Sequence, residues 1–164
     1  MATPLFDPER NPFEDVSAAL EQARRERKNV LIDLGGDWCI WCHRLEAFIA
    51  EHPELAELRD KHYVTVRIFI SDSDGTNMDF LEQLPPFTGV PHLYVYNARG
   101  SLLCSQATEP FEVGESYDLE KIRAFLQEWS DWRRSPYDAL STAELKQRFE
   151  QYLRSNDDRP TLSA

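Results

Sequence analysis

Two cysteines, Cys39 and Cys42, are separated by two residues and follow an apolar run, residues 30–34, that ends at two glycines. A Cys-x-x-Cys pair delivered by a buried strand to the start of a helix is typical of dithiol redox chemistry. The first turn of a helix carries unpaired backbone N–H groups and the positive end of the helix dipole, and both favour a thiolate over a thiol. We therefore expect Cys39 to attack a disulfide, and Cys42, on the same helical face, to resolve the mixed disulfide.

The same two cysteines allow two other interpretations, a zinc site and a haem attachment site. A zinc site needs about four ligands, and the remaining candidates, Cys104 and the four histidines, show no second pair with comparable spacing. Cys39-x-x-Cys42-His43 also matches the c-type haem attachment motif, in which His43 would be one axial ligand and Met78 the internal candidate for the other. We expect neither a metal nor another cofactor, so the Cys39–Cys42 disulfide would itself be the redox group.

Asp33 is a charged residue inside an otherwise apolar run. A carboxyl group buried in a strand has a raised pKa, which suits a proton acceptor for Cys42 when this thiol attacks. The alternative is a structural aspartate at a strand end, whose carboxylate accepts hydrogen bonds from backbone N–H groups. Asp33 is therefore the third candidate catalytic residue.

Trp38, Trp41 and His43 surround the nucleophile in the sequence. The two tryptophans would form an apolar docking face for an extended substrate, although Trp38 suits core packing equally well. His43 would raise the local positive potential when protonated, or would be a partly exposed residue without a catalytic role.

Composition limits the class of protein and of partner. The 164 residues, 41% hydrophobic, suit one domain with an appendage, and three cysteines are too few for a disulfide framework. The net charge of -11 argues against nucleic acid or an anionic membrane as partner. No apolar stretch is long enough to span a bilayer, and the first residues lack the apolar segment of a signal peptide. We expect a cytoplasmic monomer on the sequence as given, or a periplasmic one if a signal peptide has been removed.

The cysteines and Asp33 need a strand and a helix to position them, and the pattern along the chain predicts both. Asn11 and Pro12 indicate a helix start, as cap and first helical residue, after an extended lead-in over residues 1–10. An apolar stripe that includes Cys42 predicts a helix with Glu46 on its outward face. The expected order is a helix from residue 12, strand 30–34, a helix from residue 39, a helical piece 54–59, strand 63–70, loop 71–77, short helix 78–84, a hairpin of strands 92–96 and 101–106, an acidic connection 107–117, helix 119–129 and, after a boundary at 133–136, a helix opened by the capping box Ser141-x-x-Glu144.

This order resembles the thioredoxin family, over about residues 14–129. Asp33 lies six residues before Cys39, where thioredoxins carry a buried acid, and Trp38 immediately precedes Cys39 as the family's tryptophan does. Gly89-Val90-Pro91 before an apolar strand is similar to the family's cis-proline segment. Arg67 falls where thioredoxins often place a lysine near the buried acid. The four landmarks agree in identity, order and spacing, which makes the resemblance more specific than a lone Cys-x-x-Cys.

The resemblance implies a thioredoxin fold, an α/β architecture with a central mixed sheet of four to five strands flanked by helices. It also implies that the backbone of Val90 and Pro91 lies against the cysteines and pairs with the substrate chain. The sequence departs from the family in having Ile40-Trp41 between the cysteines and longer connections after the second strand and after Cys104. In these features the sequence more closely resembles the thioredoxin-like branches that include the reducing C-terminal domains of bacterial transmembrane disulfide reductases.

Three segments are expected: a thioredoxin-like domain over residues 1–134, a C-terminal helical extension over 135–154 that matches no family pattern, and a disordered tail over 155–164. The sequence predicts a thiol-disulfide oxidoreductase that reduces protein disulfides, recharged by an unidentified electron donor. The alternative is a redox-idle thioredoxin-like module whose aromatic surface binds a partner protein.

Overall fold

The computed structural model describes residues 3–138 and 141–156 of the chain. The chain divides into two compact units, residues 1–134 and residues 135–164. From residue 157 onward, the tail predicted for residues 155–164 lies outside the described residues.

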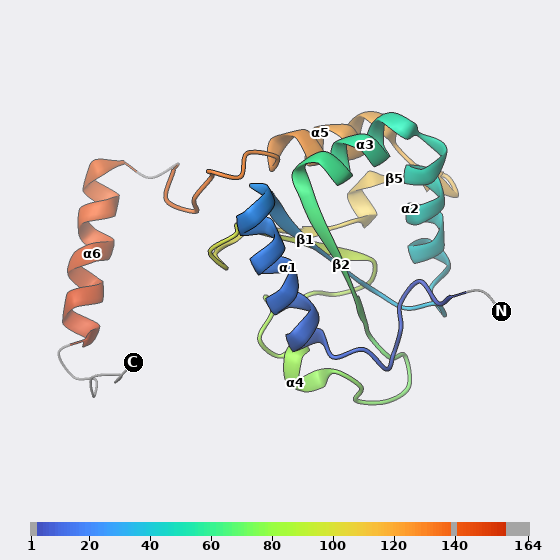
Figure 1. Ribbon diagram of the computed structural model, residues 1–164, viewed down its shortest axis with the longest axis horizontal. Coiled ribbons are helices and arrows are strands. Elements are labelled where there is room, and N and C mark those ends of the chain that lie inside the picture. The colour runs from blue at the N-terminus through green and yellow to red at the C-terminus, as the bar shows by residue number, and fades with distance from the viewer. Residues whose placement is uncertain (1–2, 139–140, 157–164) are drawn as a thin grey trace. The chain divides into compact units, whose positions relative to one another are not determined.

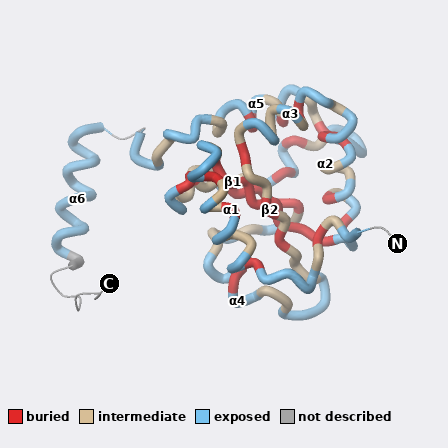
Figure 2. Tube along the Cα trace, in the orientation of Figure 1, coloured by how far each residue is buried: buried red, intermediate tan, exposed pale blue. Residues whose placement is uncertain are grey.

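A four-stranded mixed sheet forms the centre of the larger unit (Figure 1). The strand order is β2-β1-β3-β4, in which β1 pairs parallel with β2 and antiparallel with β3, and β3 pairs antiparallel with β4. The strands are β1 (Asn29–Gly35), β2 (Tyr63–Phe69), β3 (His92–Tyr96) and β4 (Leu102–Ala107). Every residue of β1 is buried because this strand lies between two others and is covered on both faces (Figure 2).

Helices cover both faces of this sheet (Figure 1). The helices are α1 (Pro12–Glu26), α2 (Ile40–Glu51), α3 (Pro53–His62), α4 (Met78–Leu81) and α5 (Leu119–Glu128). Successive residues of β1 point to opposite faces, so Leu31 packs with buried residues of α2, α3 and α5, and Ile32 packs with those of α1 and α4. Two hydrophobic cores result, one on each side of the sheet.

The helix starts follow the capping signals in the sequence. Asn11 Oδ1 accepts hydrogen bonds from Phe13 N at 3.0 Å and Glu14 N at 3.3 Å. At α5, the Asp118 carboxylate accepts a hydrogen bond from Lys121 N at 3.1 Å. These contacts satisfy backbone donors that a helix start leaves unpaired.

The connection between β4 and α5 has more structure than the sequence predicts. It contains a 3-10 turn, η1 (Glu109–Phe111), and a small hairpin of β5 (Glu112–Val113) and β6 (Ser116–Tyr117). Gly114 has a φ of 60° in the hairpin turn, a conformation that costs glycine little. Strands of two residues are too short to produce an alternating pattern.

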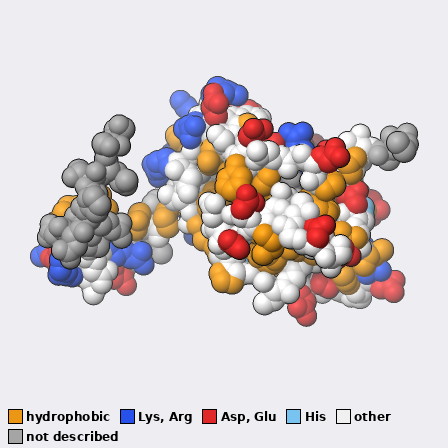
Figure 3. Space-filling view, turned by 90° about the horizontal axis from the view of Figure 1, so that it is seen from below, with side chains coloured by type: hydrophobic (Ala, Val, Ile, Leu, Met, Phe, Trp, Pro, Cys, Tyr) orange, Lys and Arg blue, Asp and Glu red, His pale blue; other side chains and the backbone are white. Residues whose placement is uncertain are grey.

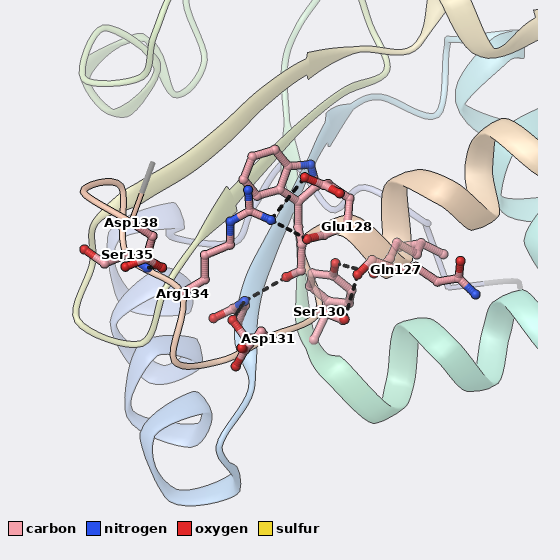
Figure 4. Close-up of polar contacts among 11 residues, drawn as sticks. Gln127, Glu128, Ser130, Asp131, Arg134, Ser135 and Asp138 are labelled. Carbon is pink, nitrogen blue, oxygen red and sulfur yellow. Dashed lines mark hydrogen bonds and ion pairs between the residues drawn. The ribbon is translucent and has the colours of Figure 1, made fainter. Parts of the chain in front are cut away.

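Polar contacts fasten the end of the larger unit to its core (Figure 4). Asn29 is fully buried, and its Nδ2 donates to the carbonyl oxygens of Trp129 and Asp131 at 2.8 and 3.0 Å. Arg134 Nη1 donates to the carbonyl oxygen of Glu128 at 2.6 Å. The segment after α5 is therefore bound to the start of β1.

The smaller unit contains one described helix, α6 (Thr142–Asn156). Ser141 and Glu144 form the expected capping box, with Glu144 N donating to Ser141 Oγ at 3.2 Å and Ser141 N donating to Glu144 Oε2 at 2.7 Å. No helix in the described ranges is long and apolar enough to cross a membrane.

On the face of the larger unit in Figure 3, acidic side chains lie scattered between hydrophobic patches.

Candidate active site

The junction of β1 and α2 presents both cysteines. Cys39 is the N-cap of α2, and the backbone N–H of Cys42 donates to Cys39 Sγ at 3.2 Å. A second backbone contact, from Cys39 N to the carbonyl oxygen of Gly36 at 3.0 Å, closes the turn before the helix. Both cysteines are free thiols, with 7% of Cys39 and 2% of Cys42 exposed.

The segment before β3 lies opposite Cys39. The Val90–Pro91 peptide bond is cis, as the resemblance implies, and Cys39 Sγ lies 3.7 Å from the carbonyl oxygen of Val90. The buried Thr108 hydroxyl donates to the carbonyl oxygen of Pro91 at 2.7 Å. Two backbone segments that are distant in the sequence thus hold the Cys39 sulfur between them.

A groove of about 180 Å³ runs beside this contact. Its lining residues are Trp41, Thr88, Gly89, Val90, Pro91, Ala107, Thr108, Glu109 and Glu112. The Trp41 ring packs edge-on against Tyr117 at a centroid distance of 5.4 Å, and the Arg44 guanidinium lies 4.6 Å from the Trp41 ring centroid. The groove therefore has an aromatic wall, a cis-proline wall and two carboxylates.

Cys42 faces the interior. Burial raises its pKa, and a hydrogen bond with the side chain of Cys39 acts in the same direction. A Cβ atom on Gly35 would lie 2.5 Å from Cys42 Sγ, so the strand end has glycine where the sulfur approaches the backbone. A thiol in this position needs a proton acceptor before it can attack.

Asp33 is a buried acid in β1, 7% exposed. None of the described residues forms a hydrogen bond with its Oδ1, unlike a structural aspartate held by backbone N–H groups. Burial raises the pKa of Asp33 to about 7, against the opposing charge of Arg67. The negative charge of Asp33 also contributes to the raised pKa of Cys42, so the two groups interact electrostatically.

Arg67 pairs in register with Asp33 across β1 and β2, but its guanidinium is held elsewhere. Arg67 Nη2 donates to Glu46 Oε2 at 2.7 Å, and Arg59 Nη1 donates to the same oxygen at 3.1 Å. Burial acts to raise the pKa of Glu46, but hydrogen bonds from both arginines lower it overall. Glu46 lies off the apolar stripe of α2, as expected, but its side chain is only 27% exposed because two arginines pair with it.

With this geometry established, comparison with known proteins identifies the family. The family model described as thioredoxin-like matches residues 11–98, more than half of the chain. The chain belongs to the thioredoxin-like family.

Relatives and solved structures of the thioredoxin-like family agree with this assignment. The chain is 28% identical over 120 residues to the thiol:disulfide interchange protein DsbD of Pseudomonas fluorescens, with 73% of this chain and 19% of that protein covered. It is 26% identical over 127 residues to the disulfide bond reductase DsbH of Chlamydia pneumoniae, with 70% of this chain and 72% of that protein covered. The chain thus spans about a fifth of the length of DsbD.

The fold is the thioredoxin fold. The crystal structure of a disulphide isomerase from Xylella fastidiosa Temecula1 superposes with a TM-score of 0.61 at 20% sequence identity, covering 78% of this chain and 98% of that chain. The predicted α/β architecture, with a four-stranded mixed sheet flanked by helices and an additional C-terminal helix, is therefore confirmed.

The two remaining predicted residues of this thioredoxin-like site lie at its edge. Trp38 is 46% exposed, and its Nε1 donates to the carbonyl oxygen of Ile70 at 2.8 Å, so core packing is the wrong interpretation. His43 is exposed, and its Nε2 donates to the carbonyl oxygen of Asp37 at 2.7 Å. His43 therefore stabilises the turn that precedes Cys39.

Phe6 and Asp37 belong to the site although sequence reasoning assigns them no role there. Phe6 is 1% exposed and packs in one cluster with Cys39 and Cys42. The Asp37 carboxylate accepts hydrogen bonds from Leu5 N at 3.1 Å and Phe6 N at 2.7 Å. An aromatic residue among prolines is the only sequence signal, and it does not indicate which surface the ring covers.

Within the described ranges, no group of three or more His, Cys, Asp and Glu side chains is arranged to hold a metal ion. Cys104 is half-buried in β4 and packs at the border of the core on the α2, α3 and α5 side.

Proposed function

We propose that this chain is a thiol-disulfide oxidoreductase that reduces protein disulfides through Cys39 and Cys42. The observation that carries the proposal is the position of Cys39 Sγ, between the Cys42 N–H at 3.2 Å and the Val90 carbonyl oxygen at 3.7 Å. A sulfur at a helix start accepts a hydrogen bond from this N–H group and lies at the positive end of the helix dipole. The names of the relatives, an interchange protein and a disulfide bond reductase, support the same chemistry.

The reaction consists of two thiol-disulfide exchanges. The Cys39 thiolate attacks one sulfur of the substrate disulfide, forms a mixed disulfide and releases the other substrate sulfur as a thiolate. The Cys42 thiol loses its proton and attacks Cys39 Sγ, which forms the Cys39–Cys42 disulfide and releases the second substrate sulfur. The substrate gains two electrons and the protein loses two, so a dithiol electron donor must reduce the pair again.

Asp33 is the proposed proton acceptor for Cys42. Burial raises the pKa of the Cys42 thiol, so this thiol does not ionise readily without a base. A carboxyl group with a pKa of about 7 is partly ionised at neutral pH and can exchange protons in both directions. We assign Arg67 an indirect role, because Glu46 holds its guanidinium and thereby limits how strongly Arg67 stabilises the Asp33 carboxylate.

The proposed substrate site is the groove beside Cys39. Its Val90 and Pro91 wall offers backbone groups to an extended chain, and the Trp41 ring offers an apolar surface. Trp38, which precedes Cys39 and is 46% exposed, offers a second apolar surface outside the groove lining. His43 supports the turn through Asp37 and takes no part in the proton transfer.

The partners are protein disulfides and a thiol electron donor of a class still to be identified. The monomeric state and the compartment, cytoplasm or periplasm, stay predictions from the sequence. Neither is needed for the two exchange steps, which depend only on the geometry around the sulfurs.

Reduction of insulin disulfides, followed by turbidity with dithiothreitol as electron donor, tests the proposal. Cys39→Ser is expected to abolish the catalysed rate, and Cys104→Ser, the matched control in the same chain, is expected to keep it. Activity that persists in Cys39→Ser would refute the mechanism. A Cys39–Cys42 reduction potential far outside about -120 to -270 mV, the range of known dithiol oxidoreductases, would favour the redox-idle binding module instead.

A further inference from the structure

The segment before α1 lies against the two cysteines. Phe6 is 1% exposed and packs with Cys39 and Cys42, and Leu5 and Phe69 pack around the same cluster. In Figure 1 the dark blue lead-in passes beside the start of α2 on its way to α1. Phe6 lies in an irregular segment, yet it is more buried than most core residues. Its side chain therefore occupies a defined pocket in the protein.

The carboxylate of Asp37 fastens this segment at both of its oxygens. Asp37 Oδ1 accepts a hydrogen bond from Phe6 N at 2.7 Å, and Asp37 Oδ2 accepts one from Leu5 N at 3.1 Å. Hydrogen bonds to a charged acceptor are among the stronger ones in proteins. Asp37 precedes Cys39 by two residues, and His43 Nε2 binds its carbonyl oxygen, so the fastening point belongs to the same turn that presents the cysteines.

The Phe6 ring and the sulfur of Cys42 occupy adjoining space above the end of β1. A Cβ atom on Gly35 would lie 2.5 Å from Cys42 Sγ and 2.9 Å from Phe6 Cζ. Both groups therefore fill the volume that a side chain at position 35 would take. The Phe6 ring is therefore one wall of the enclosure around Cys42, together with Val90 and Trp41, which pack against the same cluster.

We propose that residues 5 and 6 form a strap, fastened by Asp37, whose Phe6 ring keeps water and dissolved thiols away from Cys42. Cys42 then reacts only with the mixed disulfide on Cys39. Phe6 and Asp37 are positioning residues in this scheme, because neither touches the substrate sulfur. The strap extends the proposed function, but it can be tested without any disulfide turnover.

The test compares alkylation of Cys42 by iodoacetamide in full-length chains that carry Cys39→Ser. Mass spectrometry of the digested protein gives the Cys42 rate, and Cys104 in the same chain is the internal reference. Phe6→Ala is expected to raise the Cys42 rate relative to Cys104 about tenfold, because a fall of one unit in thiol pKa alone raises the thiolate fraction about tenfold. The pH at which alkylation of Cys42 is half-maximal should fall in parallel, whereas a general loss of stability would raise the rates of Cys42 and Cys104 together.

Phe13→Ala is the matched control, because it removes the same ring from α1, where Phe13 packs on Phe80 and not on the cysteines. It should change the ratio less than about twofold. Asp37→Ala alone should raise the ratio of the Cys42 rate to the Cys104 rate. It should add little in the Phe6→Ala background, because the effects of two residues that act through the same contact are not additive. If circular dichroism shows that Phe6→Ala is unfolded, Phe6→Leu carries the test with a smaller rise. Equal ratios and equal pH profiles in the Phe6 and Phe13 variants would overturn the strap.

Discussion

The surroundings of Cys39 and those of Cys42 differ although one helical turn separates the two residues. Cys39 lies at the edge of a groove, with the Val90 carbonyl oxygen 3.7 Å from its sulfur and the Trp41 ring in the groove wall. Cys42 lies in the interior, 2% exposed, beside Phe6 and Gly35. The first region borders an open groove, and the second is enclosed by packed side chains.

The difference shows how one turn of α2 can give two thiols two roles. The backbone N–H of Cys42 points at Cys39 Sγ, and burial raises the pKa of Cys42 itself. The interior region also contains Asp33, whose raised pKa gives it a proton affinity useful at neutral pH. In the proposed mechanism, exchange with outside molecules and proton transfer are therefore separated in space.

Removing the interior thiol should have the largest effect on this division. Cys42→Ser is expected to stop turnover and to leave substrate attached to Cys39, because the mixed disulfide can no longer be resolved from within. Mass spectrometry after incubation with an oxidised peptide should detect one covalent adduct per chain. Cys39→Ser should form no adduct at Cys42 under the same conditions, and an adduct at Cys42 of similar yield would contradict the comparison.

Asp33→Asn should change the pH dependence of stability. The pKa of Asp33 is raised from 3.8 to about 7 in the folded protein, so the folded state retains a proton that the unfolded state releases as the pH rises. Stability is therefore lost between about pH 4 and pH 7, by on the order of 4 kcal/mol in total, and is constant above that window. Asp33→Asn should remove this loss.

Urea denaturation of the reduced protein at pH 4 and pH 8 measures the effect of Asp33→Asn. The variant should gain stability relative to the wild type on going from pH 4 to pH 8. The exposed Asp72→Asn reports pH effects that do not depend on burial. A gap between Asp33→Asn and wild type that is equal at both pH values would show that the Asp33 carboxyl is not held in a dry interior.

The elements that form the groove region around Cys39 follow from local sequence signals. The run 30–34, the two glycines and Cys39 predict the β1–α2 junction, and Asn11 and Asp118 predict helix starts that the structure confirms. The cis-proline wall is predictable only through the family resemblance, because most X-Pro bonds are trans. Local patterns thus describe how Cys39 is presented.

The interior region depends on contacts that local patterns do not encode. Phe6 and Asp37 are 31 residues apart, and Arg67 and Glu46 are 21 apart. Helical periodicity assigns each residue to a face of its own helix, but it does not indicate whether a cation from another element reaches that face. The contacts of Phe6 with Asp37 and of Glu46 with Arg59 and Arg67 can therefore be found only in the folded structure.

Gly35→Ala should disturb the interior region and spare the groove. The added Cβ would lie 2.5 Å from Cys42 Sγ and 2.9 Å from Phe6 Cζ, so one of them must move. Overpacking of this kind costs about 1–3 kcal/mol of stability. Urea denaturation should show this loss, whereas Gly75→Ala, where the nearest atom would be 3.5 Å away, should not. The loss should be smaller when Phe6 is also replaced by alanine. An equal loss in both backgrounds would show that the Phe6 ring does not share the space beside Gly35 and Cys42.

The groove should show the smallest effect, a preference for basic substrates. Glu109 and Glu112 line it, and Arg44 stacks on the Trp41 ring. Burial raises the pKa of Glu112, and the charge of Glu109 adds to this effect against the charge of Arg44. A peptide disulfide with arginine beside its cysteine should be reduced about two- to fivefold faster than one with glutamate, the range for exposed ion pairs.

Steady-state kcat/KM for the two peptides measures this preference, and three further conditions test its origin. High salt should weaken it because exposed charges are screened, and lower pH should weaken it because Glu112 takes up a proton before an ordinary glutamate does. Combined Glu109→Gln and Glu112→Gln should bring the ratio close to one, whereas Glu115→Gln, in the same acidic segment but outside the groove lining, should leave it unchanged. A preference that survives the double substitution would mean that the groove beside Cys39 selects substrates by shape and backbone contacts alone. Charge would then play no part in the difference between the two cysteines.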